Sequence, residues 1–97
     1  MNKPKNTMKV SFPSRGANEG LARMLVAAFI TEADPTVEEL CDIKTAVSEA
    51  VTNCIVHAYP DRIGEIYIAA SLSESNLVTI KVRDLSLIHI SEPTRPY

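Results

Sequence analysis

Residues 47–59, which read VSEAVTNCIVHAY, carry the strongest structural signal in this chain. They place Glu49 and Asn53 four residues apart in an otherwise apolar segment, and residues at this spacing share one face of a helix. A carboxylate and a carboxamide on a buried stripe are costly to hide without partners. We therefore expect a helix here, and we interpret the pair as a candidate site, for example a base beside a metal ligand.

The helix around this segment is predicted to extend from about residue 37 to residue 58. Thr36 followed by Glu39 fits a capping box at its start. The alternative, Asp34 as the cap with Pro35 in the first turn, predicts nearly the same boundary. The apolar stripe of this helix is wide enough to pack against both a sheet and another helix, and it comprises Leu40, Ile43, Val47, Ala50, Val51, Cys54 and Ile55.

The flanking segments predict another helix and further strands. Residues 8–12 alternate between apolar and polar side chains, which indicates a short strand, and residues 18–32 have the spacing of a helix. Residues 66–72 and 78–82 alternate as strands, and residues 73–76 suit a hairpin turn between them. The inward face of the helix at 18–32 is expected to consist of Leu21, Met24, Leu25, Ala28 and Phe29.

The parity of the last strand bears on Asp84. Residues of equal parity on a strand point to the same face, and Asp84 shares parity with Val78, Ile80 and Val82. Asp84 is therefore expected to point toward the helices as a second polar group directed at one region. The alternative is that Asp84 lies just past the strand and is solvated, and the sequence favours neither reading.

Length and composition set the class of protein. The chain has 97 residues, of which 45% are hydrophobic and 23% charged, as in an ordinary small globular domain. The net charge of -2 gives no electrostatic reason to expect nucleic-acid binding. Cys41 and Cys54 lack metal-ligand spacing and are expected to be free thiols. Neither a membrane span nor a secretory signal is apparent, so a cytoplasmic protein is expected.

The pattern Glu49-x-x-x-Asn53, followed by His57, Ala58 and Tyr59, resembles the N-box of the GHKL superfamily of ATPases and kinases. The wider resemblance is to the anti-sigma F factors of sporulating bacteria, which are serine kinases that bind a sigma factor. It covers about residues 8 to 84 and includes segments 22–23, 26–30, 34–36, 39–40, 43–45 and 47–53. The implied fold is α+β, a two-layer sandwich with helices on one face of a mostly antiparallel sheet.

The resemblance implies a role for each matching residue. Glu49 would be the general base that activates a hydroxyl for attack on the γ-phosphate of ATP, and Asn53 would hold Mg²⁺. Asp84 would accept a hydrogen bond from the adenine amino group. Arg23 would contact the sigma factor and the substrate protein, although it also fits a solvated helix face. His57 is expected to be structural or capping rather than catalytic.

The function implied by the resemblance is that of an ATP-dependent protein serine kinase. It would sequester a sporulation sigma factor, phosphorylate an anti-anti-sigma protein and form a homodimer, without binding nucleic acid directly or associating with a membrane. Three alternatives stay open: an anti-sigma kinase of the general stress response, a non-catalytic module that binds a sigma factor, and the ATP-binding half of a sensor histidine kinase. For the last, the short N-terminus leaves no room for a phosphoacceptor helix.

The chain departs from the family after Asp84, where the family has a D-x-G-x-G motif and further glycine-rich loops. Residues 85–97 instead read LSLIHISEPTRPY, which resembles the translation of a sequencing adapter. We therefore expect residues 1–84 to be the N-terminal part of a GHKL-type ATP-binding kinase domain and residues 85–97 to be non-native. The alternative is a genuine C-terminal segment that extends the strand. On the first reading, this chain lacks the loops that cradle phosphates and is expected to be inactive.

Overall fold

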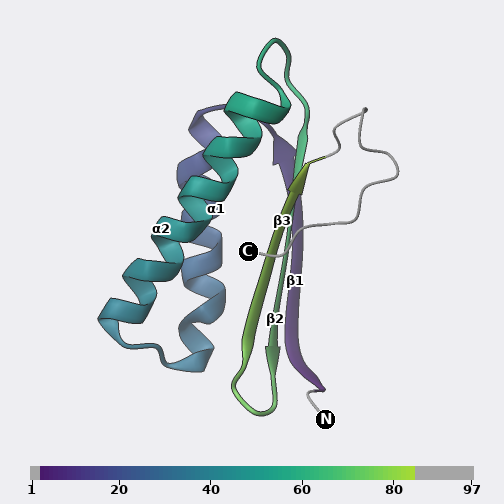
Figure 1. Cartoon of the computed structure of the whole chain (residues 1–97). Coiled ribbons are helices and arrows are strands. Elements are labelled where there is room, and N and C mark those ends of the chain that lie inside the picture. The colour runs from purple at the N-terminus through teal and green to yellow at the C-terminus, as the bar shows by residue number, and fades with distance from the viewer. Residues whose placement is uncertain (1–2, 85–97) are drawn as a thin grey trace.

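Two helices lie on one face of a three-stranded sheet in the computed structural model (Figure 1). The structure describes residues 3–84. The expected domain boundary after Asp84 and the adapter-like residues 85–97 therefore fall at or outside the end of the described part. Within residues 3–84, neither helix combines the length and the apolar character needed to cross a membrane. The predicted α+β architecture, with helices on one face of the sheet, is confirmed.

The sheet is antiparallel throughout, with strand order β1-β2-β3. Strand β1 is Pro4–Pro13, β2 is Glu65–Ser73 and β3 is Val78–Asp84. Alternate residues turn toward the helices, as the period-2 pattern predicts, and the most deeply buried are Phe12, Ile66, Ile68, Ala70, Leu72 and Val82. The β2–β3 hairpin is also confirmed, and Asn76 takes its left-handed position with φ 69°.

Helix α1, Ala17–Ile30, was predicted correctly in position but not in orientation. Its buried row is Ala22, Val26 and Ile30, which are spaced four residues apart. The expected inward residues Leu21 and Met24 are 44% and 69% exposed. The reason is that this helix is apolar on most of its circumference, so its periodicity does not select one face. The small Ala22, together with Val26, lets α1 pack closely on its neighbours.

Helix α2, Val37–Asn53, begins with the predicted capping box. The Glu39 backbone N–H donates to Thr36 Oγ1 at 3.0 Å, and the Thr36 backbone N–H donates to Glu39 Oε1 at 2.9 Å. Asp34 is not the cap, because it occupies the left-handed region (φ 55°) at the end of the short 3₁₀ turn Thr31–Ala33. The helix continues beyond Asn53 as a π-helical turn, Cys54–Ala58, rather than as the regular helix predicted to residue 58.

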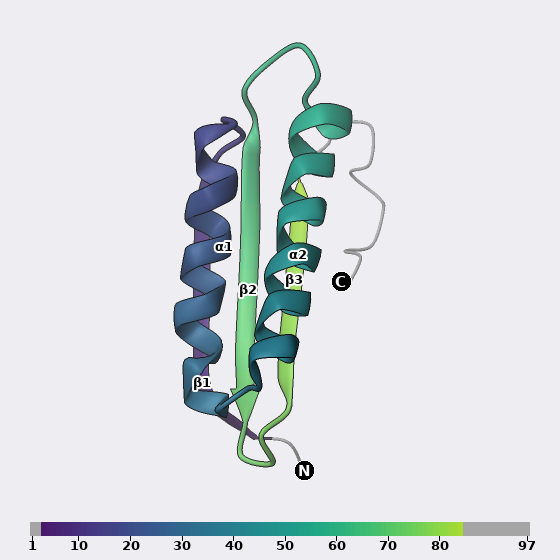
Figure 2. The same cartoon turned by 90° about the vertical axis from the view of Figure 1, so that its left-hand side faces the viewer.

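The core lies between the sheet and the two helices. Figure 2 shows α1 over β1 and α2 over β3, with β2 running between them. The largest fully buried side chains come from all layers and include Val26, Ile30, Val51, Ile66, Ile68, Leu72 and Val82. Because α2 covers the edge strand β3, residues on the outer flank of α2 lie near the free edge of the described sheet.

Candidate functional site

Glu49 and Asn53 lie on one side of α2, and both residues are exposed. Their neighbours Ala50 and Cys54 are buried at 3% and 4% exposure. The expectation that the pair shares the buried stripe was therefore wrong. Glu49 and Asn53 flank that stripe, so both keep their hydration and no burial cost needs to be offset.

Glu49 and Asn53 lie on the side of α2 that is directed toward β3. Ala46, Glu49 and Asn53 follow one another at helical spacing, so they form one row along the helix. Ala46 lines a small cavity of about 80 Å³ between α2 and β3, together with Ile43, Val47, Ile80 and Val82. The polar pair thus continues a row that begins at this cavity and runs along the free edge of the described sheet.

Asp84 points toward the helices, as its parity predicted. It is the last residue of β3, is paired with Ile66 and is half-buried. The Cys54 thiol donates to Asp84 Oδ2 at 3.9 Å, a weak sulfur contact from the helix side of the sheet. The alternative of a solvated Asp84 beyond the strand is therefore wrong. Because Cys54 directly follows Asn53, Asp84 lies at the same end of α2 as Asn53.

The π-helical turn Cys54–Ala58 begins immediately after Asn53, and sequence reasoning missed it. The Tyr59 backbone N–H donates to the Cys54 carbonyl at 3.2 Å, which is the i to i+5 bond of a π-turn. This wider turn brings Cys54 and Tyr59 to the same side, and both are buried. Turns of this kind are frequent at functional sites. His57 lies in the turn and is exposed, and its expected structural or capping role stays a prediction.

Arg23 on α1 is held by two neighbours instead of lying free on a solvated face. Its Nη1 donates to Glu19 Oε2 at 3.1 Å and to Ser48 Oγ at 3.4 Å. The Ser48 hydroxyl also donates to Glu19, so the three side chains join α1 to α2. Ser48 directly precedes Glu49. Sequence reasoning missed Glu19 and Ser48, although the spacing of four between Glu19 and Arg23 is a known helix pairing.

The polar pair has the oxygen chemistry that Mg²⁺ prefers. Mg²⁺ keeps several water ligands and usually takes one or two protein oxygens together with the phosphates of a substrate. The carboxamide of Asn53 and the carboxylate of Glu49 are exposed hard oxygen donors one helical turn apart, so they fit such an ion. Residues 3–84 contain no cluster of three or more His, Cys, Asp or Glu that would form a protein-only metal site.

Comparison with known proteins identifies the class to which this two-layer fold belongs. Residues 12–90 match the family model described as "Histidine kinase-like ATPase domain". The chain belongs to this family. The resemblance inferred from residues 47–59 is therefore confirmed at the level of the family.

Curated relatives refine the similarity. The chain is 56% identical over 79 residues to an "Anti-sigma F factor" of Thermoanaerobacter sp. (strain X514), an alignment that covers 81% of this chain and 54% of the relative. It is 43% identical over 95 residues to an "Anti-sigma F factor" of Priestia megaterium, which covers 95% of this chain and 65% of the relative. The chain thus spans about half to two thirds of the length of these relatives.

Proposed function

We propose that this chain is the N-terminal part of an anti-sigma factor that is also an ATP-dependent protein serine kinase. The observation that carries the proposal is the position of Glu49 and Asn53, one turn apart and accessible on α2 of a histidine kinase-like ATPase fold. The half-buried Asp84 is directed at the same end of that helix. The names of the curated relatives support the anti-sigma activity.

In this proposal, Glu49 is the general base. Its exposed carboxylate accepts the proton from a serine hydroxyl of the substrate protein. The Asn53 carboxamide oxygen is the ligand for Mg²⁺, which when bound neutralises charge on the phosphates of ATP. Asp84 offers its carboxylate as the acceptor for the adenine amino group. The Cys54 thiol contacts that carboxylate from the helix layer.

The proposed partners are a sporulation sigma factor and an anti-anti-sigma protein that serves as the phosphorylated substrate. Arg23 is the proposed contact residue for both, because 41% of its side chain is exposed while Glu19 and Ser48 fix its position. A fixed guanidinium recognises carboxylates with a smaller loss of side-chain entropy than a mobile one. We also propose that the protein acts as a homodimer.

Phosphoryl transfer tests the proposal. The chain would be extended with the native continuation encoded at its source locus and incubated with ATP and a candidate anti-anti-sigma protein. Glu49→Gln should slow transfer by about 10²–10⁴-fold, the usual contribution of a general base. Glu38→Gln, an exposed change in the first turn of the same helix, should leave the rate unchanged. Undiminished transfer in Glu49→Gln would remove Glu49 from this role, and binding of the sigma factor without any transfer would favour a non-catalytic module.

The gene sequence at the source locus tests the proposed boundary of the domain. We propose that residues 1–84 belong to the kinase domain and that residues 85–97 are the translation of an adapter. Resequencing across codon 84 should replace the residues that follow Asp84 with a glycine-containing motif. Recovery of LSLIHISEPTRPY from the genome would contradict this proposal.

A further inference from the structure

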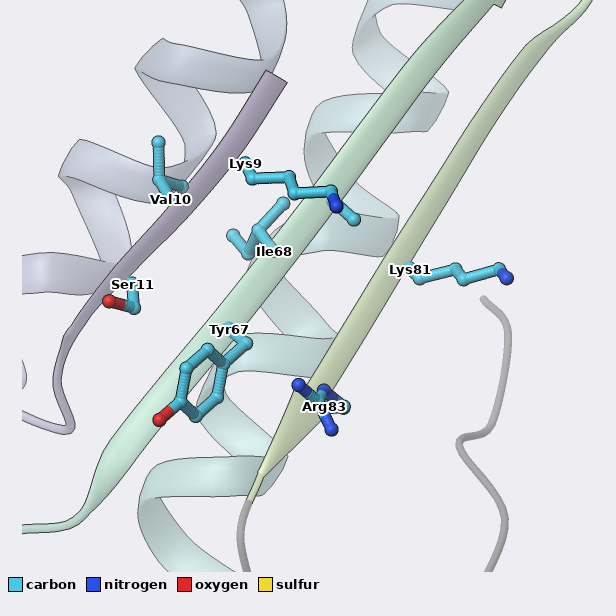
Figure 3. A pocket seen from close by; sticks show the side chains of 8 residues that line it. Lys9, Val10, Ser11, Tyr67, Ile68, Lys81 and Arg83 are labelled. Atoms are coloured by element: carbon cyan, nitrogen blue, oxygen red, sulfur yellow. The ribbon is translucent and has the colours of Figure 1, made fainter. Parts of the chain in front are cut away.

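The face of the sheet opposite the helices carries a cluster of cations that the proposed kinase chemistry does not use. Lys9 on β1 and Lys81 and Arg83 on β3 are exposed on this face (Figure 3). They border a shallow depression of about 390 Å³ whose floor includes Ala69 of β2. We call this depression with its cations the outer basic face.

The strand register explains the shape of the outer basic face. Ala69 pairs with Lys9 on one side and with Lys81 on the other, so the two lysines flank the smallest side chain in their row. Adjacent strands lie about 4.8 Å apart, which places the two lysine backbones about 10 Å from each other. Because Ala69 has only a methyl group, the gap between the lysines stays open.

Arg83, the third cation, lies in the neighbouring row of paired residues across the sheet. Tyr67 pairs with Ser11 on β1 and with Arg83 on β3. The Arg83 guanidinium lies 4.9 Å from the centroid of the Tyr67 ring, a cation–π contact that orients it over the sheet. Arg83 is therefore held in place while its N–H donors stay available to a ligand.

The charge of the outer basic face is unbalanced. Among residues 3–84, the ion pairs within 4 Å are Lys5 with Glu32 and Arg23 with Glu19, and neither involves this face. Among residues 3–84, those that line the depression include no carboxylate. The carboxylate at the margin of the face is that of Glu65, which is half-buried at the start of β2. Positive charge is thus concentrated locally on a chain whose net charge is -2.

We propose that the outer basic face binds an acidic segment of a partner polypeptide. Carboxylates would lie over Ala69 between Lys9 and Lys81 and beside Arg83. This complementarity fits an acidic peptide better than a nucleic acid, because Arg83 already covers one face of the Tyr67 ring and the basic area is small. A second copy of the chain fits poorly, since a two-fold contact would bring like charges together.

A charge-reversal experiment tests the inference on the 97-residue chain. The probe is a fluorescein-labelled peptide of alternating glutamate and glycine, with binding measured by anisotropy at low salt. Lys81→Glu should weaken binding by about tenfold, and raising the salt should weaken binding to the unchanged chain. Arg15→Glu makes the same change in net charge at an exposed position outside the depression and should alter binding by less than about twofold.

Each other outcome contradicts the inference. Equal loss in Arg15→Glu would show attraction to net charge alone. Tighter binding of a single-stranded oligonucleotide than of the peptide would assign the face to nucleic acid, and self-association abolished by Lys81→Glu would assign it to a second copy. Far-ultraviolet circular dichroism checks that Lys81→Glu is still folded. Lys81→Gln, a milder change at the same position, should also weaken peptide binding. The peptide assay involves neither ATP nor phosphoryl transfer, so failure of the kinase proposal leaves this test intact.

Discussion

At the scale of single residues, the corner after the π-turn shows how tightly the site is anchored. The Tyr59 ring is buried, and its hydroxyl donates to the Glu65 carbonyl at 2.9 Å. Gly64 lies against this ring, and the Ser14 hydroxyl accepts from the Gly64 backbone N–H at 2.8 Å. These contacts join the end of β1, the start of β2 and the turn that follows Asn53.

The close approach at Gly64 yields a prediction. A Cβ at this position would overlap the Tyr59 ring, so Gly64→Ala must displace a buried ring and should cost about 1–3 kcal/mol of unfolding free energy. Gly16→Ala is the matched control, because a Cβ there meets no atom within 4 Å. Denaturant unfolding of both variants measures the difference. Equal stability of the two would mean that Tyr59 does not pack on Gly64.

The sequence predicted the site residues unevenly. The spacing of Glu49 and Asn53 predicted that they share a side of α2, and the parity of Asp84 predicted its direction correctly. The exposure of the pair was mispredicted, because the apolar residues around it suggested burial on all sides. The link of Arg23 to Ser48 joins residues 25 positions apart, and such a contact depends on how α1 packs on α2.

At the scale of elements, local chemistry explains what could be predicted. The capping box of Thr36 and Glu39 and the alternation of β2 and β3 are signals that short segments contain. The inward face of α1 was mispredicted, because a helix that is apolar nearly all round is oriented by its neighbours. The π-turn Cys54–Ala58 was not predicted either; it leads directly to Tyr59, which is buried against Gly64.

The start of α2 offers a test at this scale. Thr36→Ala removes the hydroxyl that accepts from the Glu39 backbone N–H, and it should lower the unfolding free energy by about 1 kcal/mol. Thr45→Ala, an exposed change within the same helix, lacks this capping role and should be nearly neutral or slightly stabilising. Thermal unfolding measures both. A Thr45→Ala loss as large as that of Thr36→Ala would contradict the capping role.

At the scale of the whole molecule, the sheet separates two polar surfaces. On the helix side, the Glu49 and Asn53 pair borders the free edge of the described sheet, near Asp84. On the other side lies the outer basic face. The chain spans about half the length of the Thermoanaerobacter relative.

Asn53 is proposed to be the Mg²⁺ ligand of a nucleotide site, and calorimetry with ATP measures this role. In the chain extended with its native continuation, Asn53→Ala should weaken ATP binding in the presence of Mg²⁺ by at least about tenfold, or about 1.4 kcal/mol. Without Mg²⁺ the variant and the unchanged protein should bind ATP alike. Thr52→Ala, its exposed neighbour on α2, should bind normally in both conditions. Unchanged Mg²⁺-dependent affinity in Asn53→Ala would contradict the account.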